Sequence, residues 1–545
     1  MTTPLEELRA AVEAAAADLR DGAPPPRVAP TLERPKQAGF GDYSTNAAML
    51  LAPALKAPPR DIAERLGEAL RARLGERVER VEVAGPGFLN VFLADAWYTA
   101  AAAQVVAAGE EWGSRPPAGA AAERERVLVE FVSANPTGPM HVGHARNAAY
   151  GDALARMLAF EGHAVEREFY VNDYGSQVVR FGESIQARAR GEDVGEGGYK
   201  GDYVADLAAA IPDAAGGDPE AVARRGVELM VERMRASLHG FGVDIDHWFS
   251  ERSLHEDGLV EHAFERLEQM GSSYRSEGAL WLRTSRFGDD KDRVLERSSG
   301  DHTYFASDIA YHQEKRERGF DRLIDVWGAD HHGYVQRMKA AYGALGGEPD
   351  RLELLIMQFV HLVDRGERSS MSKRAGEFVT LDDLVAEIGV DAARWFLLAR
   401  SHDTTIELDL DVARDESEKN PVHYVRYAHA RIASIMRSAG EQRVAEALAA
   451  TPGDLALHAS ERELVRRLLT FPGEAAEAAD RRAPHRIATY ALELARTYAA
   501  FYRDCPVLKA ETEELKSFRL ALCVATRRTL ARALGLLGVS APESM

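Results

Sequence analysis

The strongest chemical pattern in this 545-residue chain spans residues 135–144. Asn-Pro-Thr-Gly-Pro leads there into Met140-His141-Val142-Gly143-His144, directly after a buried-type strand pattern and at the start of a helical one. Two imidazoles can donate hydrogen bonds to triphosphate oxygens, and a helix N-terminus offers free backbone N–H groups and a favourable dipole. Gly143 would let a nucleotide approach the backbone closely. The pattern predicts a nucleotide-phosphate site, and the alternative is a pair of histidines that only cap a helix.

A second candidate segment, residues 369–376, reads Ser-Ser-Met-Ser-Lys-Arg-Ala-Gly and holds Lys373, one of ten lysines in the chain. It follows a predicted strand. A mobile loop of this kind can bring an ammonium group to a developing pyrophosphate. Because a basic loop taken alone is usually a solvated surface, this segment gains weight only together with residues 135–144.

The elements around these segments predict a parallel sheet. Strand patterns at 127–132, 164–171, 322–327 and 354–363 are interspersed with helical patterns at 143–160 and 334–345. Alternating strands and helices indicate a doubly wound, Rossmann-like domain. We therefore predict a multidomain α/β protein with a small α+β N-terminal domain (1–115), a catalytic domain (120–408) with an insertion at about 175–300, and an all-α bundle (409–545).

Composition narrows the class of protein. The net charge of −19 argues against a protein that coats DNA, although residues 421–545 hold 18 Lys and Arg against 14 Asp and Glu. Two cysteines exclude a disulfide framework and a thiolate-rich zinc site. No apolar run is long enough to cross a membrane, and the N-terminus lacks a secretory pattern. We expect a cytoplasmic protein.

The two motif segments together resemble the paired signatures of class I aminoacyl-tRNA synthetases, His-Ile-Gly-His and Lys-Met-Ser-Lys-Ser. Residues 328–332, Gly-Ala-Asp-His-His, resemble the nucleoside-binding turn of that class. Longer blocks resemble arginyl-tRNA synthetases in particular, in the order of that family and over essentially the whole chain. They lie at 83–88, 129–139, 170–175, 304–310, 424–431 and 535–545.

The resemblance implies that L-arginine is joined to its tRNA through an ATP-derived arginyl-adenylate. It implies catalytic roles for His141, His144 and Lys373. The residues implied for ATP binding are Pro139, Met140, His141, Gly143, His144, Gly328, Asp330, Met371 and Lys373. Those implied for arginine are Glu130, Asn135, Tyr304 and Asp308, and those implied for tRNA are Phe88, Asn90, Tyr424 and Arg431.

The chemistry of arginine fits such a pocket. A guanidinium is planar, permanently charged and offers five donors, so it needs carboxylates and neutral acceptors around it. Without the resemblance, Glu130 could simply end a strand, and Tyr304 and Asp308 could be ordinary residues at a helix start. ATP with Mg²⁺ is the expected cofactor, with no metal held by the protein itself. The expected partners are arginine tRNA, L-arginine and ATP, with no membrane and a monomeric enzyme.

One position departs from the family, and other functions stay open. Ser370 stands where the signature has its first lysine, and no lysine between Lys56 and Lys200 could replace it, so Lys373 must supply the main ammonium. A small-molecule nucleotidyltransferase uses the same histidine motif on the same fold, in a much shorter chain. A catalytically silent paralogue that binds tRNA is a second alternative, and specificity for lysine a third.

Overall fold

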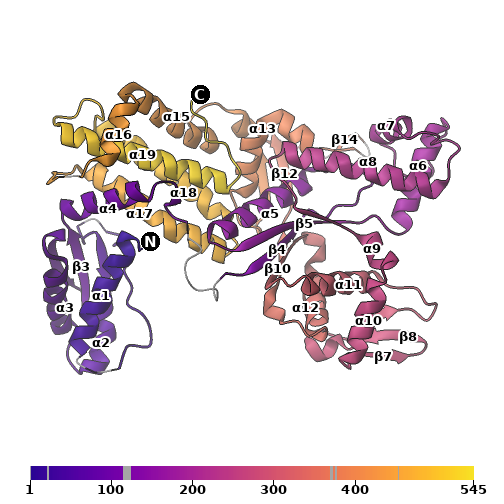
Figure 1. Ribbon diagram of the computed structural model, residues 1–545, viewed down its shortest axis with the longest axis horizontal. Helices are drawn as coiled ribbons and strands as arrows, with labels where there is room; N and C mark the ends of the chain where they lie inside the picture. The colour runs from indigo at the N-terminus through magenta and orange to yellow at the C-terminus, as the bar shows by residue number, and fades with distance from the viewer. Residues whose placement is uncertain are drawn as a thin grey trace.

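The computed structural model describes residues 2–20, 22, 24–37, 39–114, 124–368, 372–374, 377–451 and 453–545, and it leaves the side chains of 372–374 and 377–378 undescribed. Figure 1 shows an N-terminal unit beside a helical bundle, and a central sheet with helices on both faces. The predicted multidomain α/β class is confirmed.

The N-terminal unit is a three-stranded antiparallel sheet, order β1-β3-β2, with helices against it. Its buried side chains recur at helical spacing, as in Leu8, Val12 and Ala15 of the first helix. The elements are α1 (Pro4–Arg20), β1 (Tyr43–Thr45), α2 (Ala47–Leu55), α3 (Pro59–Leu74), η1 (Gly75–Arg77), β2 (Val78–Ala84), β3 (Phe88–Leu93), α4 (Asp95–Ala108) and η2 (Gly109–Glu111).

The central sheet is five-stranded and parallel, in the order β11-β10-β4-β5-β6. Its strands are β4 (Arg126–Phe131), β5 (Ala164–Val171), β6 (His247–Ser250), β10 (Arg322–Gly328) and β11 (Leu352–Met357). Helix α5 (Val142–Phe160) covers one face, and α11 (Tyr304–Glu317) and α12 (Val335–Ala344) cover the other. Helix α5 lies close to the sheet because Gly151 has no side chain: a Cβ there would lie 2.1 Å from the Phe131 ring.

Strand β6 lies inside the range where the sequence predicted an insertion, and it pairs with β5 at the edge of the sheet. The four residues of β6 are too few to give a strand pattern in the sequence. The predicted insertion therefore consists of two segments, one on each side of β6. Before β6 come α6 (Ser176–Ala189), α7 (Asp202–Ala210) and α8 (Pro219–Gly240); after it come α9 (Glu251–Glu256), α10 (Leu259–Gln269), β7 (Ser273–Ser276), β8 (Ala279–Leu282), η3 (Thr284–Phe287) and β9 (Arg293–Glu296).

The predicted strand at 354–363 is two strands in two sheets. It breaks at Gln358 and Phe359, whose carbonyls accept hydrogen bonds from the buried guanidinium of Arg146, so the ladder cannot continue. The remaining elements of this part are η4 (Ala329–Tyr334), η5 (Pro349–Arg351), β12 (Val360–Asp364), β13 (Glu367–Arg368), β14 (Ser372–Arg374), β15 (Glu377–Phe378), α13 (Leu381–Leu398) and β16 (Ile406–Asp409).

The C-terminal bundle packs directly on helix α5. It consists of α14 (Leu410–Arg414), α15 (Pro421–Ala439), α16 (Glu441–Ala449), α17 (Ala459–Asp480), α18 (Pro484–Asp504) and α19 (Glu513–Leu536). One apolar core runs from the N-terminal unit through α5 into this bundle. Arg466 of α17 donates to Asp42 and to the Tyr98 hydroxyl, which joins the bundle to the N-terminal unit.

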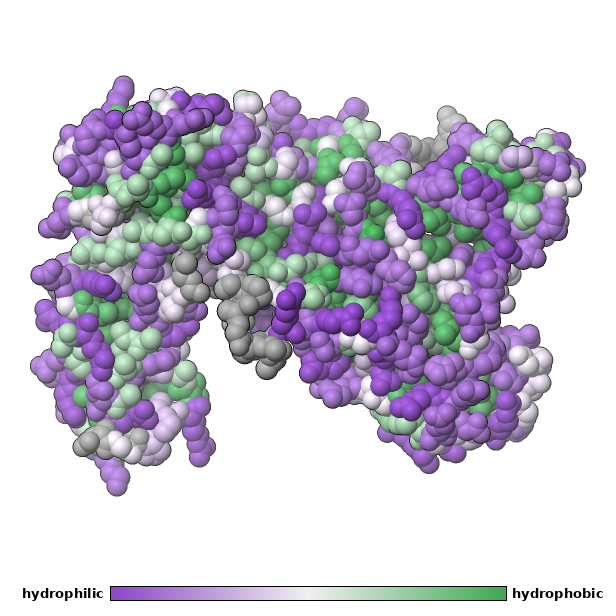
Figure 2. All heavy atoms as spheres, in the orientation of Figure 1, coloured by the Kyte–Doolittle hydropathy of each residue, from purple (hydrophilic) through white to green (hydrophobic). Residues whose placement is uncertain are grey.

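The visible face of the molecule is mostly hydrophilic, with a wide hollow between the N-terminal unit and the central sheet (Figure 2). Across the part of the chain that the structure describes, no helix has the length and apolar character needed to cross a membrane.

Candidate active site

The histidine motif lies at the point where the strand order of the parallel sheet reverses, between β4 and β10. β4 continues through α5 to β5 on one side, whereas β10 continues through α12 to β11 on the other. Ligands of doubly wound sheets bind in the crevice at the carboxyl ends of such strands. Val132 (φ 71°) and Ser133 (φ 43°) turn the chain sharply there. A left-handed backbone is unfavourable for a β-branched residue and is typical of functional sites.

The two histidines are held in a defined tautomer. The Nδ1 of His141 accepts from the Gly143 amide (3.1 Å), and the Nδ1 of His144 accepts from the His141 amide (3.2 Å). Burial lowers the pKa of His141, and burial with the adjacent His141 lowers the pKa of His144 to about 3. Both imidazoles are therefore neutral at pH 7 and carry their proton on Nε2, so each presents a donor.

The rings of His141 and His144 stack with their centroids 3.7 Å apart. Gly143 makes this possible, because a Cβ at that position would lie 2.8 Å from the His141 ring. The absence of a side chain at Gly143 therefore leaves room for the His141 ring.

The expectation of free backbone N–H groups at the start of α5 is wrong. The Val142 amide donates to the Val379 carbonyl (3.2 Å), and the Gly143 amide donates to His141. The amides of His144 and Ala145 donate to the His141 carbonyl. Because the first-turn amides are engaged, the imidazoles are the candidate donors to a phosphate at this helix end.

The backbone brings the second motif next to the first. Met371 and Ser370 lie outside the described residues, as does the side chain of Lys373, whose backbone forms β14 in a hairpin with β15. The chain that follows the hairpin is attached to the histidine motif. His141 pairs antiparallel with Thr380, and the Leu381 amide donates to the Met140 carbonyl (2.8 Å). The hairpin that carries Lys373 therefore ends two residues before this attachment.

The candidate nucleoside turn ends the neighbouring strand β10. Gly328 is its last residue, and a Cβ there would lie 2.7 Å from the Asp330 carboxylate. Asp330 is exposed and contacts the His331 ring (Nδ1 to Oδ1, 3.1 Å), so its second oxygen faces away from that contact. Of the other ATP candidates, Pro139 is exposed and Met140 is buried. The turn and the histidine motif thus follow the carboxyl ends of two neighbouring parallel strands, β10 and β4.

The candidate arginine residues divide into two carboxylates, the buried Glu130 and the half-buried Asp308, and two surface residues. Asp308 accepts from the Tyr334 hydroxyl (2.5 Å), and burial raises the pKa of its carboxyl. Since Tyr334 ends the η4 segment that begins after Gly328, this bond joins the carboxylate to the nucleoside turn. Glu130 is buried and accepts from Ser133 (2.6 Å) and Lys315 (2.5 Å).

The other two candidates do not enclose a ligand in this structure. Tyr304 is 84% exposed at the start of α11. Asn135 is exposed, and its amide oxygen accepts from Asn172 (2.8 Å). The structure brings Glu130 and Asp308 to the face of the sheet covered by α11, and leaves Tyr304 and Asn135 at the surface.

Sequence reasoning missed two further acids. Glu251 follows β6, and burial together with Asp308 and Asp173 raises the pKa of its carboxyl to about 8. Asp173 accepts from the Ser250 hydroxyl (2.6 Å). Burial, and then the charges of Glu251, Asp308, Glu130 and Asp173, raise the pKa of Tyr170. The four carboxylates thus converge around one tyrosine, and acids at the ends of two neighbouring parallel strands were the signal for this.

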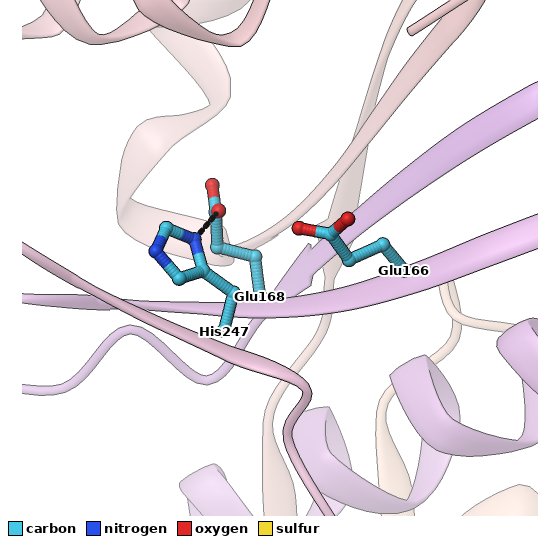
Figure 3. Close-up of side chains that lie close together, drawn as sticks. All are labelled: Glu166, Glu168 and His247. Atoms are coloured by element: carbon cyan, nitrogen blue, oxygen red, sulfur yellow. Dashed lines mark hydrogen bonds and ion pairs between the residues drawn. The ribbon is translucent and has the colours of Figure 1, made fainter. Parts of the chain in front are cut away.

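A cluster suited to a cation lies on the same sheet but is already filled. Ligand atoms of Glu166, Glu168 and His247 lie within 4.8 Å of one another, and Figure 3 shows His247 bonded to Glu168. The Arg318 guanidinium donates to Glu168 (2.6 Å) and approaches the His247 Nδ1 (2.8 Å). An arginine therefore occupies the position that a metal ion would take.

The candidate tRNA residues differ in how far their side chains are exposed to solvent. Phe88 is 39% exposed at the start of β3, whereas Asn90 is 4% exposed in the centre of that sheet. In the bundle, Tyr424 packs against the core. Arg431 is exposed, donates to the Tyr427 hydroxyl (2.9 Å) and lies 4.5 Å from the centre of the Tyr502 ring. Tyr427 and Tyr502 were missed, although Tyr427 stands one helical turn before Arg431.

Three family profiles match the chain in succession. "Arginyl tRNA synthetase N terminal domain" matches residues 6–93. "tRNA synthetases class I (R), catalytic domain" matches 114–191 and 220–432, and "DALR anticodon binding domain" matches 425–545. Two curated relatives, both named arginine–tRNA ligase, are similar over nearly the full length. That of Carboxydothermus hydrogenoformans is 46% identical, over 98% of this chain and 97% of its own. That of Geobacillus kaustophilus is 45% identical, over 94% of each chain.

Solved structures agree with these profiles. The arginyl-tRNA synthetase of Thermus thermophilus superposes with a TM-score of 0.76 at 27% identity, over 99% of both chains. That of Plasmodium falciparum shares the fold with a TM-score of 0.74 at 17% identity, over 100% of both chains. The profiles, the relatives and the fold agree, and the chain belongs to the arginyl-tRNA synthetase family.

Proposed function

We propose that this protein joins L-arginine to its cognate tRNA, with ATP bound as its magnesium complex and with AMP and pyrophosphate as products. The observation that carries this proposal is the bond between Asp308 and Tyr334, which sets a half-buried carboxylate beside the nucleoside turn. A guanidinium and a nucleotide could then be bound side by side. We place the N-terminal tRNA-contacting unit at 1–115, the catalytic domain at 120–408 and the anticodon-binding bundle at 409–545.

In the activation step, the arginine carboxylate attacks the α-phosphate of ATP in line and pyrophosphate leaves. Charge develops on the phosphate oxygens as the bond to the leaving group lengthens. The Nε2–H groups of His141 and His144 would donate to these oxygens, and the ammonium of Lys373 would approach them from the hairpin. Gly328 and Asp330 would hold the adenosine, with Asp330 accepting from ribose hydroxyls. The 2′-hydroxyl of the tRNA end would then attack the activated carbonyl.

Arginine is recognised in this proposal by Asp308, Glu130 and the neighbouring acids, with Asn135 and Tyr304 closing on the ligand from the surface. The tRNA would be contacted by Phe88 at its outer corner and by Arg431 with its neighbouring tyrosines at the anticodon. Asn90 and Tyr424 would support these contacts from within their domains. We further propose a cytoplasmic monomer without a metal of its own. Size-exclusion chromatography with light scattering tests the oligomeric state.

Pyrophosphate exchange tests the function. Labelled pyrophosphate should enter ATP when arginine is present, and omission of tRNA would show whether activation depends on it. Exchange that responds to another small substrate and not to arginine would favour a nucleotidyltransferase. Binding of tRNA without any exchange would identify a silent paralogue. Exchange that depends on lysine instead of arginine would show that the enzyme is specific for lysine.

Replacing Lys373 with alanine should lower the rate of activation more than it weakens ATP binding. The ammonium acts on charge that is present mainly in the transition state, so kcat should fall while the KM for ATP changes little. Exchange kinetics at varied ATP concentration measure both. A rise in KM alone would make the lysine a ground-state contact, and the cation that replaces the signature lysine at Ser370 would then have to be sought elsewhere.

Replacing Arg431 with alanine should weaken tRNA binding roughly 10-fold, because the guanidinium and the adjacent tyrosines form a surface on which unpaired bases can stack. Filter binding of labelled tRNA measures the affinity. Arg481→Ala is the matched control, since Arg481 is an exposed arginine of the same bundle that pairs with Glu477. Equal affinities of both variants and the parent would exclude this surface from tRNA binding.

A further inference from the structure

Three carboxylates lie side by side across the parallel sheet, beneath the proposed arginine pocket. Glu130 of β4 is in register with Asp325 of β10 on one side and with Glu168 of β5 on the other. Glu168 is in turn in register with His247 of β6. We call Asp325, Glu130 and Glu168 the acidic row. All three acids are buried. Helix α11 covers the acidic row with Tyr311, which donates to Glu168, and with Lys315 one helical turn later, which donates to the other two acids.

Lys315 of α11 is the cation at the centre of this arrangement. It is fully buried, and its Nζ donates to Glu130 (2.5 Å) and to Asp325 (2.8 Å). Its third side faces the Tyr311 ring, 4.2 Å from the ring centre. Burial alone would lower the pKa of Lys315, but Asp325 and Glu130 more than offset this and raise it. The lysine therefore remains charged, with all its donors directed at acceptors or a ring.

His312 completes the balance of charge. Its Nδ1 lies 2.7 Å from the Asp308 carbonyl and its Nε2 lies 2.8 Å from the Asp325 carboxylate. Both partners are acceptors, so both positions need a proton. Whether the second proton stays on the imidazole or moves to Asp325, the group of Glu130, Lys315, Asp325 and His312 has no net charge.

The two carboxylates proposed to bind arginine, Glu130 and Asp308, consequently differ in whether their charge is already matched within the protein. The charge of Glu130 is already matched by Lys315, and its remaining lone pairs can still accept hydrogen bonds. Among the described side chains, Asp308 forms no ion pair and accepts only from the neutral Tyr334 hydroxyl. An incoming guanidinium would therefore find its counter-charge at Asp308 and a neutralised acceptor at Glu130.

We infer that Lys315 is a positioning residue that fixes Glu130 and cancels its charge, so that Glu130 selects arginine by hydrogen bonding while Asp308 selects it by charge. The inference rests on the proposed function, because it assigns these carboxylates to arginine. It leads to a specific expectation for charge in the pocket. Removing the charge of Glu130 alone should be more harmful than removing it together with the charge of Lys315.

The test compares Glu130→Gln with the double variant Glu130→Gln/Lys315→Met. In the single variant Lys315, Asp325 and His312 together carry one excess positive charge beside a cationic substrate, and the KM for arginine should rise on the order of 10–100-fold. In the double variant that charge is gone and the glutamine oxygen still accepts, so the KM should return to within about fivefold of the parent value. The KM for ATP should change little in either variant. Exchange kinetics with saturating tRNA give the KM for arginine and the KM for ATP. Calorimetry measures the affinity for arginine independently.

A matched pair of variants separates this effect from loss of a buried ion pair. Arg519 of α19 donates to the buried Glu461 (2.6 Å) within the bundle. Glu461→Gln and Glu461→Gln/Arg519→Met should lower the melting temperature and leave the KM for arginine unchanged. If the Lys315 double variant binds arginine as poorly as Glu130→Gln or worse, or if the KM for ATP rises in parallel, the positioning role is wrong. Failure of the proposed function would appear earlier, as absence of arginine-dependent exchange in the parent protein.

Discussion

Replacing His144 with alanine is expected to lower the rate of arginyl-adenylate formation about 10²–10³-fold, the usual effect of losing one donor to a transition-state oxygen. The structure gives the reason for so large an effect. The first-turn amides of α5 are engaged within the protein, so they do not substitute for the missing imidazole. Single-turnover adenylate formation measures the rate, and His141→Ala is expected to behave in the same way.

The same histidine should show no titration in the working range. Its pKa of about 3 keeps the imidazole neutral, so the donor on Nε2 is present at every pH above about 5. The pH profile of adenylate formation should therefore not fall as pH rises through 6.5, the ordinary histidine value. A loss of activity around that pH, which His144→Ala removes, would mean that the imidazolium is the active form.

Stability and tRNA affinity serve as controls for the histidine variants. Thermal unfolding should shift little for His144→Ala, because the Nδ1 bond to the His141 amide is one of several that hold this turn. Affinity for tRNA should stay at the parent value, since Arg431 and Phe88 lie on other domains. Near-parent rates of adenylate formation in both alanine variants would exclude this crevice as the phosphate site.

Asp308→Asn should raise the KM for arginine about 10²-fold or more, with little change in the KM for ATP. Removing one member of a desolvated charge pair leaves the other unpaired, which makes such substitutions costly. The asparagine keeps the size of the side chain and can still accept from Tyr334, so the change tests charge and not shape. Exchange kinetics at varied arginine concentration, with tRNA present, measure the effect.

Substrate analogues test the same pocket from the other side. Canavanine keeps the planar fork of donors and should be activated far better than lysine, whose ammonium leaves acceptors unpaired at about 1–3 kcal/mol each. Citrulline, which is neutral and has an oxygen in place of a donor, should fail. Equal use of lysine and arginine, or unaltered arginine affinity in Asp308→Asn, would place the amino-acid pocket elsewhere.

The sequence by itself determined the local elements around the motifs. Strand β5 matches its predicted range, and α5 begins at Val142, beside the predicted start at Gly143. The local signals are the largely apolar helix sequence, buried on nearly all sides, and the continuous apolar strand β4 before it. The motifs and longer blocks also indicated the family. Elements that depend on distant partners were less visible, as the short strand β6 and the break at Gln358 demonstrate.

Tertiary structure alone decided which side chains meet and which stay covered. Glu130 and Lys315 are 185 positions apart, and nothing in the sequence near Glu130 announces that its charge is matched. The attachment of Thr380 to His141 also depends on how the chain returns to the crevice. The resemblance implied that Asn90 contacts tRNA, yet the pairing of β3 with strands on both sides buries its side chain. Local patterns report short-range geometry, whereas charge balance and access depend on contacts between segments far apart in the chain, which only the folded structure brings together.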